Sequence, residues 1–160
     1  MALHTVRYAL ATAAGKDATL ALHRARASGL TVPIAFCIYD QVTERVRFHG
    51  TRRTLVEAQA AALGLELIAL PCAAGEFEAV FHRLLAELKA RKIGGVVFGN
   101  IHLEDVRAWY EDRTRAAKLK HVEPLWKAPP GELVREIIAL GYRPIVVSVD
   151  LARGEHVRGR

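Results

Sequence analysis

Residues 13–19 have the amino-acid types of a phosphate-binding turn. They follow an apolar run at residues 6–12 and lead directly into a helical pattern. Small side chains allow a tight turn, and the free amide groups at the start of a helix can hold phosphate oxygens. Lys16 can neutralise phosphate charge, and Asp17 can bind a Mg²⁺ ion that bridges two phosphates. The segment is not the Walker loop, and an ordinary strand-to-helix turn explains it equally well.

A second group of polar residues follows another apolar run, between residues 100 and 112. Its carboxylates are Glu104, Asp105, Glu111 and Asp112. Glu104, Arg107 and Glu111 share one face of a predicted helix. Such carboxylates can attract an ammonium ion and accept its proton, while Arg107 can pair with a substrate carboxylate or phosphate. An exposed helix start with acidic residues that suit the helix dipole would have the same composition.

These polar groups lie between short apolar runs and longer helical patterns that alternate along the whole chain. The apolar runs predict buried parallel strands. We expect strands at residues 6–12, 33–39, 66–71, 93–99 and 143–149. We expect helices at residues 17–28, 54–63, 76–91, 103–118 and 131–140. The alternation predicts an α/β fold, a Rossmann-like three-layer sandwich with a five-stranded parallel sheet.

In such a sheet, ligands bind outside the carboxyl ends of the strands. This rule directs attention to the segments 13–17, 40–53 and 100–107. His49, in the second of these, is a candidate contact for a nucleotide or substrate, although a loop histidine is often only solvated.

Composition limits the function classes without choosing among them. The chain has 160 residues, 51% of them apolar, and a formal net charge of +6, which favours anionic partners such as nucleotides or RNA. No apolar run approaches the roughly 20 residues that span a bilayer, so we expect no membrane contact. We expect a cytoplasmic protein, although the first 15 residues could also be read as a signal peptide. Cys37 and Cys72 form no metal-binding or disulfide pattern.

Several segments together resemble a known family. The turn at residues 13–18 resembles the Ser-Gly-Gly-Lys-Asp-Ser loop of the N-type ATP pyrophosphatases. Further stretches resemble one branch of them, the diphthine–ammonia ligase family and its bacterial relatives. They are His49-Gly50-Thr51 with Gln59-Ala60 and Leu63-Gly64, the segment from Val97 to Arg107, and Glu123-Pro124-Leu125-Trp126.

The resemblance implies an ATP- and Mg²⁺-dependent ligase that activates a carboxylate by adenylation and then forms an amide. The substrate would be a small molecule or a protein that bears the carboxylate. The implied nucleotide contacts are Thr12, Ala13, Ala14, Gly15, Lys16, Asp17, Cys37, His49, Gly99 and Asn100, with Asp17 at the metal. The implied catalytic residues are Lys16, Asp17, Glu104, Arg107 and Glu111.

The chain also departs from the family pattern. Ala13, Ala14 and Ala18 replace two serines and a glycine, and Asn100 replaces the usual aspartate. We expect a nucleotide-binding domain at 1–150 and a tail at 151–160, without the further C-terminal segment of the family. The departures leave open a nucleotide-binding module without turnover. The basic charge leaves open a relative that modifies tRNA, and a homo-oligomer is also possible.

Overall fold

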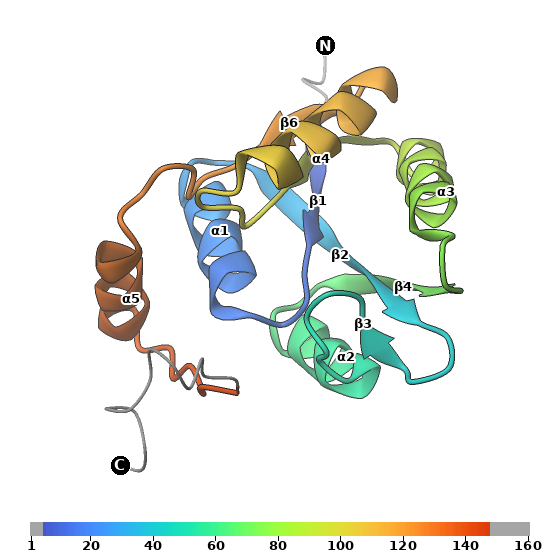
Figure 1. Ribbon diagram of the computed structural model, residues 1–160. Helices are drawn as coiled ribbons and strands as arrows, with labels where there is room; N and C mark the ends of the chain where they lie inside the picture. Colours follow the sequence, from blue (N-terminus) through green and yellow to red (C-terminus); the bar gives the residue numbers. More distant parts are fainter. Residues whose placement is uncertain (1–4, 148–160) are drawn as a thin grey trace.

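The computed structural model describes residues 5–147 (Figure 1). Its strands are β1 (Arg7–Ala11), β2 (Thr31–Asp40), β3 (Arg45–Val46), β4 (Glu66–Cys72), β5 (Ile93–Val97) and β6 (Lys120–Val122). Its helices are α1 (Lys16–Ala27), α2 (Arg53–Ala62), α3 (Phe77–Ala90), α4 (Glu104–Ala116) and α5 (Pro130–Ala139). The helices lie within two residues of the bounds predicted from hydrophobic periodicity.

The sheet is parallel except for one short strand. Strands β4, β2, β1, β5 and β6 lie side by side in that order, and all of their pairings are parallel. The short β3 pairs antiparallel with Tyr39 and Asp40 at the end of β2. Because β4 occupies the other edge of β2 at these residues, β3 extends the sheet on the side of β1, beyond the last residue of β1. The loop around β3 therefore reaches over the carboxyl end of β1.

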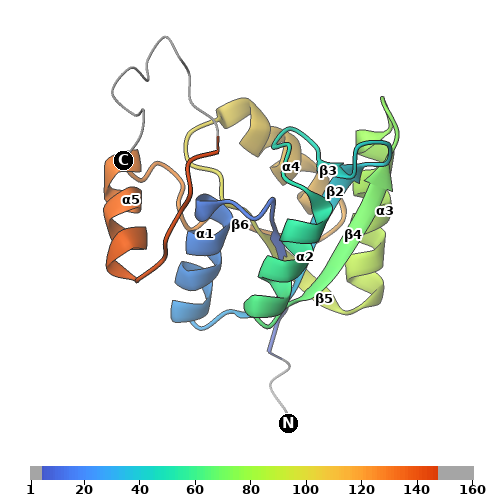
Figure 2. The ribbon, with the colours of Figure 1, turned by 90° about the horizontal axis from the view of Figure 1, so that it is seen from below.

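Helices cover both faces of the sheet. Side chains of α3 and α4 pack on one face around Phe81 and Leu84. Side chains of α1, α2 and α5 pack on the other face around Leu20 and Ile137. Figure 2 shows β4 between α2 and α3. The arrangement confirms the predicted α/β sandwich with a parallel sheet. Among residues 5–147, no helix has the length and apolar character needed to cross a membrane.

The predicted last strand is wrong over the residues that the structure describes. Residues 143–147 form no strand, and Ile145, Val146 and Val147 are exposed. The fifth parallel strand is instead β6, which pairs with β5. An apolar run indicates a tendency to form a strand, but it does not show whether a sheet edge is within reach. The last two residues of the predicted strand, 148 and 149, and the predicted tail lie outside the described residues.

Candidate functional site

The turn between β1 and α1 is held in place by bonds to its backbone. The Ala14 amide donates to Thr12 Oγ1 at 3.0 Å. The Gln59 side chain, from α2, donates to the Ala14 carbonyl at 3.2 Å. The amides of Gly15 to Ala18 donate to no residue in the described part of the chain. Four amides at the start of a 12-residue helix are therefore available to an anion.

Ala14 adopts a backbone conformation that favours glycine. Its φ is 60°, in the left-handed region, where the resembled loop has glycine. An alanine at this φ is strained, whereas a glycine would not be. At Gly15, a Cβ atom would meet nothing within 4 Å, so the space beside the turn is open.

Gly99 brings the end of β5 close to the same turn. A Cβ atom at Gly99 would lie 2.8 Å from the Ala18 amide nitrogen and 2.9 Å from the Asp17 carbonyl carbon. Both atoms belong to the backbone of α1 and cannot move aside. Only glycine permits this approach, which places Asn100 beside the start of α1.

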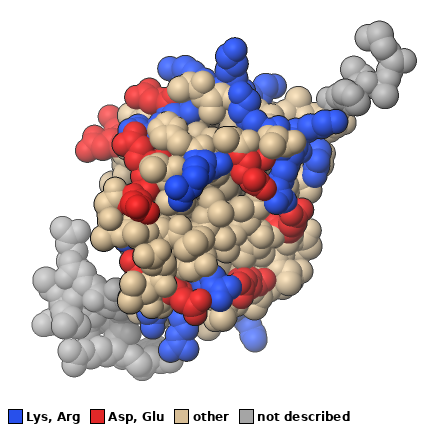
Figure 3. Space-filling view, turned by 90° about the vertical axis from the view of Figure 1, so that its right-hand side faces the viewer, with Lys and Arg blue, Asp and Glu red and all other residues tan. Residues whose placement is uncertain are grey.

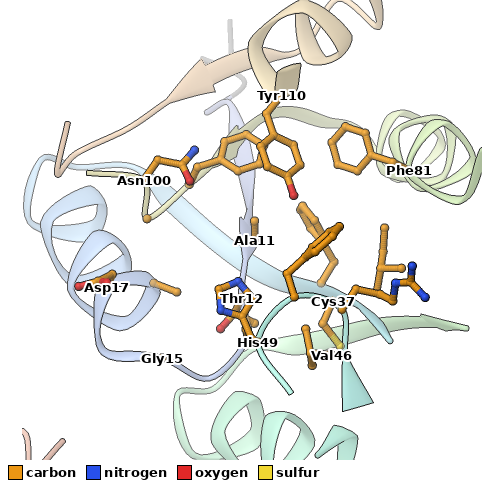
Figure 4. A pocket seen from close by; sticks show the side chains of 18 of the residues that line it. Ala11, Thr12, Gly15, Asp17, Cys37, Val46, His49, Phe81, Asn100 and Tyr110 are labelled. Carbon is orange, nitrogen blue, oxygen red and sulfur yellow. The ribbon is translucent and has the colours of Figure 1, made fainter. Parts of the chain in front are cut away.

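A cavity of about 240 Å³ opens at this edge of the sheet (Figure 4). Its walls come from the turn, the end of β2, the loop around β3, the start of α3, the end of β5, and α4. Eight predicted contacts line it, namely Thr12, Ala13, Gly15, Asp17, Cys37, His49, Gly99 and Asn100. Two others, Ala14 and Lys16, belong to the turn but do not line the cavity.

Lys16 and Asp17 are paired with each other. Lys16 Nζ lies 2.8 Å from Asp17 Oδ1 and 2.9 Å from Oδ2, and both side chains are partly exposed. Among the described residues, no three His, Cys, Asp or Glu side chains gather as a metal site, and Asp17 is the only carboxylate in the cavity wall. A Mg²⁺ ion fits this site only if phosphate oxygens supply further ligands, which is the usual mode of Mg²⁺ in nucleotide sites.

Behind the part of the wall that contains Asn100, at the ends of β5 and β6, lies a buried carboxylate, Glu123, which does not itself line the cavity and whose side chain is 3% exposed. Its Oε1 accepts from the Asn100 amide at 2.8 Å and lies 2.9 Å from His121 Nε2. Its Oε2 lies 3.1 Å from Arg107 Nε, at an angle that makes a charge contact without a hydrogen bond. The Arg107 guanidinium also stacks on Trp126, 4.6 Å from the ring centre.

The predicted catalytic residues of α4 lie outside the cavity lining. Glu104 is exposed, and its nearest charged group is Lys127 Nζ at 3.9 Å. Glu111 pairs with Arg115 at 2.8 Å and lies 3.6 Å from Arg107. The shared helix face does bring Arg107 and Glu111 together, but these three residues do not meet at the turn.

Sequence reasoning missed two groups of residues. One is the pair His121 and Glu123, although the Glu-Pro-Leu-Trp segment was a signal for the second of them. The other is the aromatic part of the cavity wall, which consists of Phe48, Phe77, Phe81, Phe98 and Tyr110. These aromatic residues come from four separate segments, and no motif in the sequence connects them.

One protein family matches this chain over most of its length. The family model described as diphthamide synthase N-terminal domain matches residues 6–121, which include the turn and all the residues that line the cavity. A search of curated proteins found no match.

Two solved structures share the fold. One is a predicted subunit of tRNA methyltransferase from Methanocaldococcus jannaschii, with 14% identity and a TM-score of 0.58 over 84% of this chain and 76% of that one. The other is the U34-tRNA thiolase NcsA from Methanococcus maripaludis with its 4Fe-4S cluster. It has 14% identity and a TM-score of 0.57 over 91% of this chain and 60% of that one. At this identity the likeness shows the fold alone.

Proposed function

Because the chain belongs to the family of the diphthamide synthase N-terminal domain, we propose that it is an ATP-dependent ligase that forms an amide through an adenylated carboxylate. One observation carries the proposal. Gly99 holds the end of β5 against a turn whose four amides are free among the described residues, and a cavity opens between them. Free amides at a helix start, beside a cavity, suit a phosphate chain.

The turn would hold the phosphates of ATP. The amides of Gly15 to Ala18 would bind phosphate oxygens, and Lys16 would turn from Asp17 toward the negative charge. Asp17 would then be free to hold Mg²⁺ together with the phosphates. When bound, the ion neutralises charge on the departing pyrophosphate. The backbone near Thr12 and Cys37, with His49, would contact the rest of the nucleotide.

The proposed reaction has two steps, adenylation of the carboxylate and formation of the amide. A carboxylate oxygen attacks the α-phosphorus of ATP, the bond from that phosphorus to the bridging oxygen breaks, and pyrophosphate leaves. Ammonia or an amine then attacks the carbonyl carbon of the acyl adenylate, and AMP leaves as the amine loses a proton. Activation is required because AMP is a far better leaving group than hydroxide. Amide donors at the turn contribute by stabilising charge as it moves onto pyrophosphate.

We assign Glu104, Arg107 and Glu111 to the acceptor and the nitrogen donor. Arg107 suits a substrate carboxylate, because Glu123 and Trp126 fix its guanidinium beside the wall that contains Asn100. The carboxylates of Glu104 and Glu111 suit the attraction of an ammonium ion. Gly99 and Asn100 complete the nucleotide side of the site.

Pyrophosphate release with ATP, Mg²⁺ and candidate carboxylates tests this function. We expect Lys16→Ala to reduce the rate by about 10²-fold or more, because it removes a charge that stabilises the leaving group. Lys89→Ala is the matched control, since Lys89 is an exposed lysine on α3, away from the cavity. Binding of ATP by calorimetry, with no pyrophosphate formed for any acceptor, would instead support a binding module without turnover.

A second candidate is an enzyme that modifies tRNA. The net charge of +6 favours it, as does the fold shared with a predicted subunit of tRNA methyltransferase and with a U34-tRNA thiolase. A 4Fe-4S cluster does not fit this chain, because such clusters take four cysteines and the chain has two. On the face seen in Figure 3, basic side chains are interspersed with acidic ones. Tight tRNA binding that weakens steeply with salt would favour this candidate over the ligase.

A further inference from the structure

We propose that the aromatic half of the cavity is a binding site for a flat, uncharged heteroaromatic ring that accepts a hydrogen bond from Tyr110. We define the aromatic half by its five side chains, Phe48, Phe77, Phe81, Phe98 and Tyr110. The ring could be the base of the nucleotide or part of the acceptor, and in this respect the inference rests on the proposed function.

The five rings have geometry suited to a flat guest. Tyr110 packs against Phe98 at 4.8 Å and, edge-on, against Phe81 at 5.2 Å. Phe77 lies parallel to Phe81 at 6.4 Å between ring centres. All of these rings also line the cavity, so faces and edges remain available on that side. Aromatic pairs prefer offset-stacked or edge-to-face contacts, and both kinds are offered here.

Within residues 5–147 the Tyr110 hydroxyl forms no hydrogen bond, since the bond from Thr114 Oγ1 goes to the Tyr110 backbone carbonyl. The hydroxyl is not among the fully buried polar atoms without a partner, so it is open to the cavity that Tyr110 lines. Figure 4 shows the hydroxyl pointing from α4 toward the centre of the cavity. Burial raises the pKa of Tyr110, so the hydroxyl stays protonated and can donate. A ring nitrogen of a ligand in the cavity would supply an acceptor for this hydroxyl.

Phe48 places a further ring at the edge of the cavity. Its side chain is 80% exposed, and its ring meets Phe77 edge-on at 5.2 Å. Its φ is 68°, so a bulky residue occupies the left-handed region in which glycine is favoured. An exposed phenylalanine held in a strained backbone beside a cavity is typical of a ligand contact rather than of core packing.

Charge distinguishes the two halves of the cavity. Within residues 5–147, the only Asp, Glu, Lys or Arg side chains that line the cavity are Asp17, at the turn, and Arg47, beside Phe48. The aromatic half therefore has no carboxylate from the described chain that would pair with a cation. Phosphates belong at the free amides of the turn. Arg47 is already paired with Asp40 at 3.2 Å, so an uncharged ring suits the aromatic half better than a charged group.

Calorimetry on Tyr110→Phe and Phe48→Ala tests the inference. ATP and inorganic tripolyphosphate are titrated separately, because tripolyphosphate has the charge but no ring. If the ring is the base, we expect ATP to bind about fivefold more weakly to Tyr110→Phe, the loss of one hydrogen bond, with tripolyphosphate unchanged. Phe48→Ala should also weaken ATP alone.

A second titration distinguishes an acceptor ring from the base. Nicotinate, whose flat pyridine ring is uncharged and carries the carboxylate as a substituent, is titrated into protein saturated with tripolyphosphate. If neither substitution changes the affinity for ATP but both lower the affinity for nicotinate, the ring belongs to the acceptor. If neither ATP nor nicotinate responds to either substitution, the inference is overturned.

Controls separate this inference from the proposed function. Tyr142→Phe removes the same hydroxyl from a tyrosine that packs in the opposite core, and it should leave all titrations unchanged. Trp109, 5.0 Å from Tyr110, provides a fluorescence signal in a Trp126→Phe background. If no pyrophosphate is released, the ligase proposal is wrong but the ring site is unaffected. If both variants bind ATP and nicotinate as tightly as wild type does, the ring site is wrong but the ligase proposal is unaffected.

Discussion

The two walls that meet at Gly99 are built in different ways. The wall at the turn is held mainly through backbone groups, since Thr12 and Gln59 bond the amide and the carbonyl of Ala14. The wall at β5 and β6 is held by side chains that converge on the buried carboxylate of Glu123. A backbone-held wall tolerates changes of side chain, whereas a wall of side chains does not.

This difference accounts for where the departures from the family pattern fall. Ala13, Ala14 and Ala18 all lie in the wall held by backbone, and the free amides of the turn survive there. Asn100 lies in the other wall, where its amide is a donor to Glu123. An aspartate in this place would bring a second carboxylate to the same oxygen. The amide of Asn100 therefore suits the Glu123 carboxylate better than an aspartate would.

The largest effect is expected from Glu123→Ala. The substitution leaves His121 and Asn100 without their acceptor and leaves Arg107 with only the more distant carboxylate of Glu111, at 3.6 Å. We expect the free energy of unfolding to fall by about 3 kcal/mol, since breaking a buried ionic contact leaves its partners unsatisfied. Urea unfolding measures the change.

Two further variants sharpen the result for Glu123. Glu132→Ala removes an exposed carboxylate from α5 and should change stability by less than about 0.5 kcal/mol. Glu123→Gln keeps an acceptor for Asn100 and should cost less than Glu123→Ala. Equal stability of wild type and Glu123→Ala would contradict a wall held by side chains.

Asn100→Asp should have the next largest effect. It replaces a donor, 2.8 Å from Glu123 Oε1, by a second carboxylate. We expect a loss of about 1–3 kcal/mol in the free energy of unfolding, the usual cost of an unsatisfied buried polar group. Asn100→Ser, which keeps a hydroxyl donor, should lose less. If the Asn100→Asp protein is as stable as wild type, Glu123 does not need this donor.

Sequence patterns predicted much of the fold and one of the two walls. The turn was found because all its elements are consecutive, from β1 through residues 13–17 into α1. The strand β6 was missed because Lys120–Val122 is short and partly polar, with its place fixed only by pairing with β5. The pairing of a short strand with a neighbour from another part of the chain leaves no periodic pattern in the sequence.

The wall at β5 and β6 was harder to predict for a similar reason. Asn100 and Glu123 are 23 residues apart, and nothing in either segment alone indicates that their side chains meet. The aromatic half of the cavity also combines separate segments. Resemblance to a family identified the motif segments, but it did not assign a role to Glu123. The roles given to Glu104, Arg107 and Glu111 stay predictions.

Ala14→Gly tests the wall held by backbone. Because Ala14 has φ of 60°, glycine should relieve strain and raise the free energy of unfolding by about 1 kcal/mol. Ala13→Gly is the control, because Ala13 has no positive φ and glycine there should be neutral or destabilising. If turnover has been lost through Ala14, the glycine variant should also release pyrophosphate faster. Destabilisation by Ala14→Gly would show that the turn is not strained.

The smallest effect concerns the thiol of Cys37, a buried residue of β2 that lines the cavity. Burial raises its pKa to about 11, so the folded protein keeps this thiol protonated where an unfolded chain ionises it. The folded state binds the extra proton between about pH 9 and 11, and stability should therefore fall as pH rises through this range. Cys37→Ala should remove part of that fall and leave the pH dependence of stability near pH 7 unchanged.

At pH 8, labelling of Cys37 by iodoacetamide should be about 10²-fold slower than labelling of a free thiol, because few thiolates form. Rapid labelling of native protein at Cys37 would show that the thiol is open to solvent through the cavity, and it would contradict the raised pKa.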